Sequence, residues 1–275
     1  MVKKIFFLNL VLIILSVNLY SDFDPLKYDP RKSIKDPNSE LSVERLKNKL
    51  WLFNTIKKSN KYLKTHPKDL EGYIVRNFLI FFLTTIEKNK ADQYKYFEVG
   101  IKYCKDGLKY FPGNRFMKMM YVSFTTQKYL YIGAHYVLHN AEIIAKSLKQ
   151  IVKEEPGCCF GRAAFFLGRM YYKLPRFPVS IGNLAKSKKY LNIAIKNNPA
   201  LLAAYLSLAD SEYNAGNIKS ALNILKKAKK IKPKIWLDYY NNKYYQPGIN
   251  VMYNGIKNNT WNGKDIFLII KNINE

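Results

Sequence analysis

Apolar residues recur at helical spacing along most of the chain. From about Ser42 to Ile231 they form successive amphipathic segments of roughly 12 to 20 residues. Turn-forming residues rich in Asn, Gly and Pro separate these segments, at 65–67, 111–114, 155–157, 197–199 and 232–233. The sequence lacks the strict alternation of apolar and polar residues that is typical of half-buried strands. The pattern therefore predicts an all-α protein.

The first 41 residues depart from this pattern. Two lysines precede an apolar run at 5–17, and Ser21 stands before the first acidic residue. This is the layout of a secretory signal peptide, so we expect cleavage of residues 1–21 and export to the periplasm. An uncleaved N-terminal membrane anchor is the alternative, although a spanning helix needs ~20 apolar residues. Residues 22–41 contain three prolines among polar residues and are expected to form an extended tether.

An internal repeat is the most informative feature of the sequence. Pro199 and Pro233 lie 34 positions apart. Between them, bulky and small residues alternate along two helical segments joined at a glycine: Tyr205, Leu208, Ala209, Gly216, Ala221, Leu225 and Ala228. Small residues let two helices approach closely, and bulky residues fill the gaps between neighbouring hairpins. The segment is therefore predicted to be one unit of a stack of helical hairpins.

This pattern resembles the tetratricopeptide repeat (TPR). The resemblance is closest over residues 157–235 and looser over 42–156, where degenerate repeats are expected, such as Gly100, Cys104 and Gly107 before Pro112. It implies a TPR-like solenoid in which the first helix of each repeat lines a concave groove. Residues 236–275 are expected to form a cap and tail, with a capping helix at 235–245 and a short final helix at 265–273.

A weaker resemblance points to one branch of TPR proteins. The exported setting, the long connection at 174–186 and the run from Gly168-Arg169 to Pro175 are similar to the TPR component of TRAP-type transporters. Those proteins are periplasmic adaptors that dock a substrate-binding protein. The resemblance implies the same class of role for this chain.

The net charge of +26 needs an explanation. We predict no nucleic-acid partner, because the protein is expected to be exported and only seven of its 46 basic residues are arginine, the side chain that reads bases bidentately. Abundant Lys, Asn, Ile, Tyr and Phe are typical of AT-rich genomes. Much of the charge is therefore expected on solvated helix faces, including the lysines at 226–234, with an acidic protein partner or anionic lipid as alternatives.

Few residues suggest chemistry. His135, His139 and Glu142 fall on one face of a predicted helix and are weak candidates for a zinc site. The adjacent Cys158 and Cys159 begin a helix, where a thiol pKa can fall, but buried packing is the more frequent role of such cysteines. Because hydrolase elbows, phosphate loops and dinucleotide fingerprints are absent, we predict neither enzymatic activity nor a cofactor.

One basic stretch is the candidate binding site. No Asp or Glu occurs between Glu155 and Asp210. In this stretch, cationic and aromatic residues are expected on an exposed face of a first helix, opposite the packing pair Leu167-Gly168; they are Arg162, Phe165, Arg169, Tyr172 and Lys173. Such a groove suits an acidic peptide or another anion, and a solvated basic face without a ligand is the alternative.

These features together favour an exported protein–protein adaptor that binds an acidic partner in its groove. An accessory of a solute transport system that handles a small anionic ligand is the second hypothesis. The third is an envelope protein that its lysines hold to anionic lipid as a peripheral membrane protein.

Overall fold

The computed structural model describes residues 48–232, 236–263, 266–267 and 269–270. Within these ranges the secondary structure is α-helical, and the one extended pairing is an isolated bridge between Arg176 and Gly182. The predicted signal peptide and tether lie outside the described residues. The described chain divides into two compact units, and the boundary along the sequence lies between Ile132 and Gly133.

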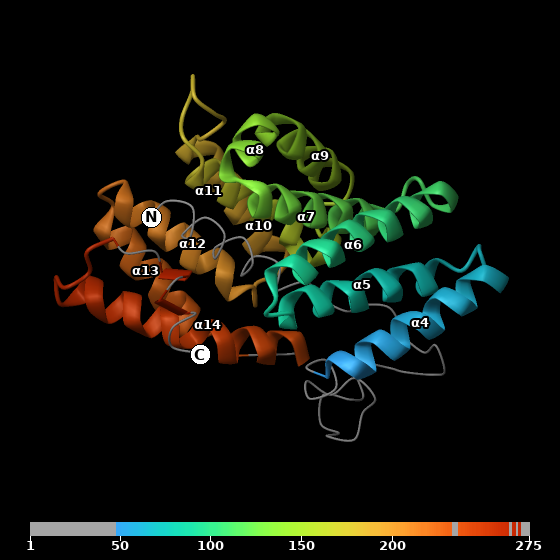
Figure 1. The fold of residues 1–275 in the computed structure, drawn as a ribbon. Helices are drawn as coiled ribbons and strands as arrows, with labels where there is room; N and C mark the ends of the chain where they lie inside the picture. Colours follow the sequence, from blue (N-terminus) through green and yellow to red (C-terminus); the bar gives the residue numbers. More distant parts are fainter. Residues whose placement is uncertain (1–47, 233–235, 264–265, 268, 271–275) are drawn as a thin grey trace. The chain divides into compact units, whose positions relative to one another are not determined.

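The unit that ends at Ile132 consists of four helices that each pack on the next. They are α4 (Lys49–Thr65), α5 (Leu70–Ile86), α6 (Lys90–Tyr110) and α7 (Arg115–Ile132). Figure 1 shows α4, α5 and α6 side by side. Polar side chains cap the first three helices at their N-termini, where Asn48, Asp69 and Asn89 accept hydrogen bonds from backbone N–H groups of the first turn.

The helix α5 forms the core of this unit because it is apolar around most of its circumference. It packs against α4 and α6 and also contacts α7. Small residues on α6 allow this close packing: a methyl group at Gly107 would lie 3.0 Å from Cδ1 of Tyr73, and one at Gly100 would lie 2.6 Å from Cε1 of Phe124. Gly100, Cys104 and Gly107 are all buried on α6, and the expected core position of Cys104 is confirmed.

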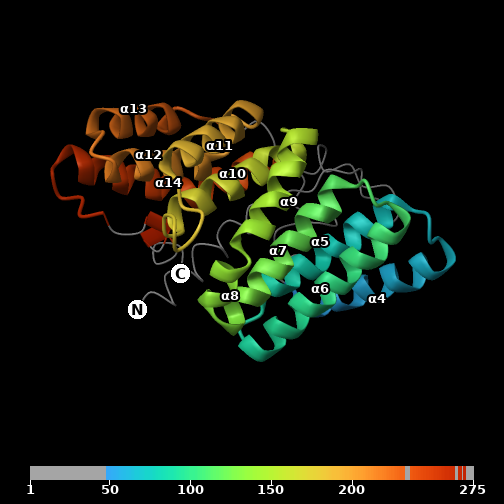
Figure 2. The ribbon, with the colours of Figure 1, turned by 90° about the horizontal axis from the view of Figure 1, so that it is seen from above.

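The unit that begins at Gly133 contains the remaining helices. They are α8 (Ala134–His139), α9 (Ala141–Glu154), α10 (Cys158–Lys173), α11 (Leu184–Asn197), α12 (Leu202–Asn214), α13 (Ile218–Lys229) and α14 (Trp236–Lys257). The pairs α10/α11 and α12/α13 form hairpins, and α10 and α14 also contact α12. Figure 2 shows α10 to α13 as neighbouring layers. This stacking of hairpins is the TPR-like architecture that the repeat predicts.

The residues of the repeat take the places expected of them. Ala209 on α12 and the set Ala221, Leu225 and Ala228 on α13 are all fully buried. Gly216, between the two helices, has a φ of +80°, which favours glycine. In the preceding hairpin, a methyl group at Gly168 would lie 2.8 Å from Cγ of Leu191, so this glycine sets the close approach of α10 and α11.

The C-terminal helix is longer than predicted. It was expected to end at Tyr245, before Pro247, but α14 continues to Lys257. Pro247 removes one backbone donor, yet the residues beyond it keep an apolar face at helical spacing through the buried Ile249, Met252 and Ile256. Because α14 packs on α12 and α13, it caps the last hairpin as predicted. In the tail, residues 266–267 and 269–270 are helical.

The two compact units do not follow the boundary at 156/157, which marks where the TPR resemblance becomes closer. Compactness divides the described chain at 132/133 instead. Gly133, in the short connection between α7 and α8, has a φ of +150°. The ranges 42–156 and 157–235 differ in how closely their sequences resemble the repeat, and as domain boundaries they stay predictions.

Overpacking the repeat should destabilise it. We expect Ala209→Leu and Ala221→Leu each to lower the free energy of unfolding by about 1–3 kcal/mol, because each adds a branched side chain where the helices leave no space. Urea denaturation followed by circular dichroism measures the change.

Ala215→Leu is the matched control, since Ala215 is exposed at the C-cap of α12. Its effect should stay within about 0.5 kcal/mol. Equal stability of all three variants would contradict the close pairing of α12 and α13.

Candidate functional site

The predicted groove on α10 is not exposed. Every residue from Gly161 to Tyr171 is buried, so the helix has no solvated face over these turns. Arg162 and Arg169 are each 1% exposed, and Phe165 is 0% exposed. The expectation that these side chains line an open groove was wrong, because α9, α11 and α12 all pack around α10.

The other members of the predicted groove, Tyr172 and Lys173, are partly exposed and belong to a polar network around the buried Asp210. Lys173 Nζ lies 3.1 Å from Oδ2 of Asp210, and Asn214 Nδ2 donates hydrogen bonds to the Tyr172 hydroxyl (2.7 Å) and to the side chain of Asp210 (3.1 Å). Burial raises the pKa of the Tyr172 hydroxyl well above its usual range. The network joins α10 to α12.

The missing acidic residues come from the next repeat. The stretch between Glu155 and Asp210 has no carboxylate of its own, but α12 supplies Asp210 to Lys173 and Glu212 to Lys188 across the hairpin interface. The second of these ion pairs spans 2.6 Å. The positive field expected of this stretch is therefore partly neutralised. The partner-binding role of the five residues loses the exposure on which it was based and stays an untested prediction.

The Arg169 guanidinium lies 4.0 Å from the ring centre of Phe267 and 3.4 Å from the Ser207 hydroxyl. A cation over an aromatic face is attracted by the ring quadrupole. Arg169 therefore connects α10 to Ser207 on α12 and to Phe267 in the C-terminal tail.

The weak metal candidates are separated by a helix break. His135 and His139 lie on α8 and Glu142 on α9, because the helix that the sequence predicts is interrupted at Asn140. In the described part of the chain, no three His, Cys, Asp or Glu side chains cluster closely enough to hold a metal ion.

The cysteines are free thiols. The Sγ atoms of Cys158 and Cys159 lie 3.1 Å apart. Their mutual hydrogen bond, and then burial, raise the pKa of the Cys159 thiol, which is the opposite of what a reactive thiolate needs. Cys104 is buried in α6, as the repeat pattern predicts.

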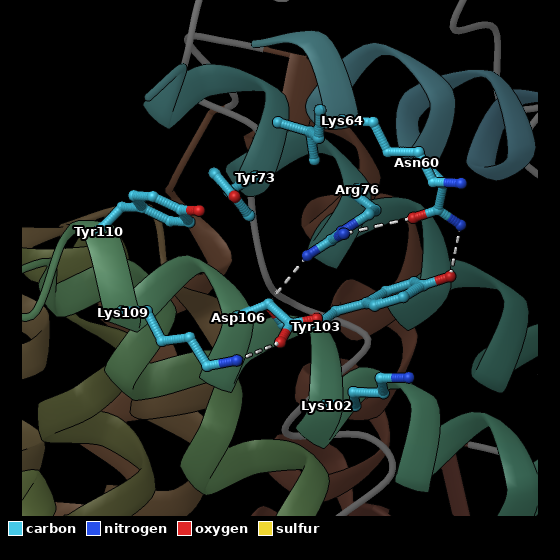
Figure 3. A pocket seen from close by; sticks show the side chains of 10 residues that line it. Asn60, Lys64, Tyr73, Arg76, Lys102, Tyr103, Asp106, Lys109 and Tyr110 are labelled. Atoms are coloured by element: carbon cyan, nitrogen blue, oxygen red, sulfur yellow. Dashed lines mark hydrogen bonds and ion pairs between the residues drawn. The ribbon is translucent and has the colours of Figure 1, made fainter. Parts of the chain in front are cut away.

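An open cleft in the unit that ends at Ile132 is the better candidate site (Figure 3). It has a volume of about 530 Å³ and lies among α4, α5 and α6. Four cationic side chains and one carboxylate line it, together with three tyrosines: Lys64, Arg76, Lys102, Lys109, Asp106, Tyr73, Tyr103 and Tyr110. The lining is therefore cationic and aromatic.

Arg76 is the central side chain of this cleft. It is 6% exposed, and its guanidinium lies 4.0 Å from the ring centre of Tyr103 and 5.0 Å from that of Tyr73. Nη1 donates to Oδ1 of Asn60 (3.3 Å), and Nη2 donates to the Tyr103 carbonyl (3.2 Å). Asn60 in turn donates to the Tyr103 hydroxyl (2.7 Å), which fixes the guanidinium in one orientation, as Figure 3 shows.

The charge of Arg76 is not neutralised by an ion pair with any carboxylate of the described residues. Burial lowers the pKa of its guanidinium, and the Asp106 carboxylate opposes that effect only as a longer-range charge. Asp106 itself pairs with Lys109 at 3.3 Å. Two of the five guanidinium N–H groups are used in the bonds above, and Nε has no acceptor. A buried cation with unused donors is suited to an incoming anion.

Sequence analysis missed Arg76, although a signal was present. It is one of seven arginines, and together with Asn77 it interrupts the apolar and aromatic residues at 73–83. An arginine in the middle of a core helix is rarely buried without a partner. The partners are an amide on α4 and a tyrosine on α6, which no local pattern connects with position 76.

The lysines at the end of α13 are exposed, as expected of a solvated face. Lys226, Lys227, Lys229 and Lys230 all project to solvent, while Leu225 and Ala228 between them are buried. Lys229 also lies 4.6 Å from the ring centre of Tyr253 on α14.

Comparisons with known proteins give a remote likeness. No family model and no curated protein matches the chain. Among solved structures, the human IFIT1 dimer with PPP-AAAA is similar over 91% of this chain, at 14% identity and a TM-score of 0.42. The chain spans 62% of the length of that protein's chain. No helix in the described ranges is long and apolar enough to cross a membrane.

Reversing the buried charge on α10 should destabilise the protein. We expect Arg169→Glu to lower the free energy of unfolding by about 3 kcal/mol or more, because it places an anion against the ring face of Phe267 in a buried site. Urea denaturation measures the loss.

Lys226→Glu is the control, since this side chain is exposed on α13. It should change stability by about 0.5 kcal/mol at most. A wild-type unfolding midpoint for Arg169→Glu would show that the guanidinium is solvated after all.

Proposed function

We propose that this chain is a helical-repeat adaptor that binds an acidic segment of a protein partner in the Arg76 cleft. The observation that carries the proposal is the buried guanidinium of Arg76, held by Asn60 and Tyr103 at the base of an open cationic cleft. An acidic side chain that enters the cleft would meet the preorganised donors of Arg76 and the lysines of the rim.

The aromatic lining supports a peptide rather than a bare ion. Tyr73 and Tyr110 have ring centres 5.9 Å apart, and the second of these residues is 48% exposed. Tyrosines give an entering chain a rigid apolar surface with a polar end at little cost in conformational entropy. A second cleft is lined by residues of α6 and by Lys128 of α7, and it shares Lys102, Asp106 and Lys109 with the Arg76 cleft. An extended segment therefore has cationic contacts beyond Arg76.

We also keep the proposal that the protein is exported and meets its partner in the periplasm. It is supported by the basic and apolar start of the sequence. In this proposal, some of the cations behind the net charge of +26 bind the acidic partner. The others are solvated, such as the lysines of α13.

A small anionic solute is the second candidate for the same cleft. The volume of about 530 Å³ is within the range of small-molecule sites and favours this reading. A solute would support the hypothesis of a transport accessory. Citrate, as a compact trianion, is a suitable probe: an increase in melting temperature that depends on Lys64 and Lys102 would favour a solute over a protein segment.

The test uses a fluorescent peptide rich in Asp and Glu. The double variant Lys64→Glu/Lys102→Glu should weaken binding by roughly tenfold or more, because each reversal replaces a charge-assisted contact with repulsion. Both side chains are exposed at the rim, so the fold should be unaffected. Fluorescence anisotropy at two salt concentrations measures the dissociation constant, which should rise with salt.

The matched control is Lys57→Glu/Lys58→Glu, which makes the same change in charge at exposed positions of α4 outside the cleft. It should weaken binding by less than roughly threefold at physiological salt, since distant exposed charges are screened. Equal losses in the two double variants would mean non-specific attraction and would remove the site.

A further inference from the structure

The connection between α10 and α11 exposes an apolar tip. Phe177 is 89% exposed, the highest value of any large hydrophobic residue in the described ranges, and Val179 is 68% exposed. Pro178 lies between them and is also exposed. Figure 1 shows this connection as the yellow loop that projects away from α11. Two large apolar side chains this exposed, on either side of an exposed proline, indicate a contact surface.

Backbone hydrogen bonds fix the shape of this loop. The N–H of Gly182 donates to the Pro175 carbonyl (2.8 Å) and that of Asn183 to the Tyr171 carbonyl (2.7 Å), which closes the base. Near the tip, the N–H of Val179 donates to the Arg176 carbonyl (3.1 Å). Gly182 is required at the base because a methyl group there would lie 2.6 Å from the Pro175 carbonyl oxygen. The tip is therefore presented by a preorganised turn.

Cationic side chains surround the base of the loop. Lys149 and Lys186 lie 5.8 Å and 5.6 Å from the ring centre of Tyr171, the residue whose carbonyl closes the loop. Both are exposed, as is Arg176 within the loop. The loop and its flanking segments contain no carboxylate. Among the neighbouring acidic side chains, Asp210 and Glu212 of α12 are paired with Lys173 and Lys188, and Glu142 of α9 interacts with Lys149 as a charge.

From this arrangement we propose that the loop at 175–182 inserts its apolar tip into an anionic lipid surface. An apolar tip enters the boundary between headgroups and acyl chains, while lysines and arginine at its base remain at the level of the anionic headgroups. The charge decides between lipid and protein as the occupant: the tip offers only two large apolar side chains, too few for a protein interface, whereas the cations around it favour an extended anionic surface. This inference is independent of the Arg76 cleft, which lies in the other unit.

The experiment places a fluorescent reporter in the tip of the full chain. The F177W variant is mixed with vesicles of phosphatidylcholine alone, or with roughly one third phosphatidylglycerol, whose acyl chains are brominated to quench an inserted indole. The wild-type emission, from three native tryptophans, is subtracted. We expect strong quenching of the F177W indole by the anionic vesicles and little by the neutral ones. I218W is the matched control, because Ile218 is 41% exposed on α13, a helix that carries neither the loop nor the cations at its base; its indole should not be quenched.

A second measurement is the vesicle partition coefficient of the double variant Phe177→Ser/Val179→Ser, which should fall roughly tenfold or more relative to wild type. Its circular dichroism should be unchanged, since both side chains are exposed. The quenching decides the question, because the apolar run at 5–17 is present in every variant and can itself bind vesicles. Binding without quenching at position 177, or equal quenching by neutral vesicles, overturns the proposal. The proposal is also overturned if the wild type does not bind vesicles and the loop variants lose binding to a protein partner.

Discussion

The fold depends on the close approach of paired helices, which only small residues permit. Gly168 on α10 lies against Leu191, and Gly107 on α6 lies against Tyr73 and Met117. The buried Ala209 and Ala221 serve the same purpose in α12 and α13. Because each hairpin buries only part of its apolar surface within itself, the remainder must be covered by the next one. The separation of helices within a pair therefore sets which residues the neighbouring pair can reach.

This constraint explains why the cations of α10 are internal. Once α11 approaches through Gly168 and α12 stacks on α10, no side of α10 remains open between Gly161 and Tyr171. Long basic side chains in such a helix interact with groups of the same unit. Arg169 packs on the ring of Phe267, and Lys173 forms an ion pair with the carboxylate of Asp210. Buried charges are tolerated when they are paired in this way, and their removal from water is the cost of doing so.

The contrast between these residues and Arg76 shows what could be predicted from the sequence. Helical periodicity and the spacing of small residues are local properties, so the hairpin of α12 and α13 could be identified from residues 199–233 alone. The environment of a charged residue is not local. The sequence predicts Arg162 and Arg169 on a free face because their own segment lacks acids, whereas Arg76 stands in a segment whose other residues are mostly apolar. Which of them faces a cleft depends on contacts with α4 and α6, or with α12, that lie 16 or more positions away.

The same reasoning limits what the net charge of +26 can mean. Charge on the solvated face of α13 adds to a general field that salt screens within roughly 10 Å at 0.1 M. Charge becomes specific where the backbone fixes it beside a surface of another kind. At Arg76 that surface is a pair of tyrosine rings, and around the loop at 175–182 it is an apolar tip. In both proposals an aromatic side chain, rather than a second cation, decides which anionic partner would fit. The cleft would take a chain with side chains that pack on the rings, and the loop would take a layer with an apolar interior.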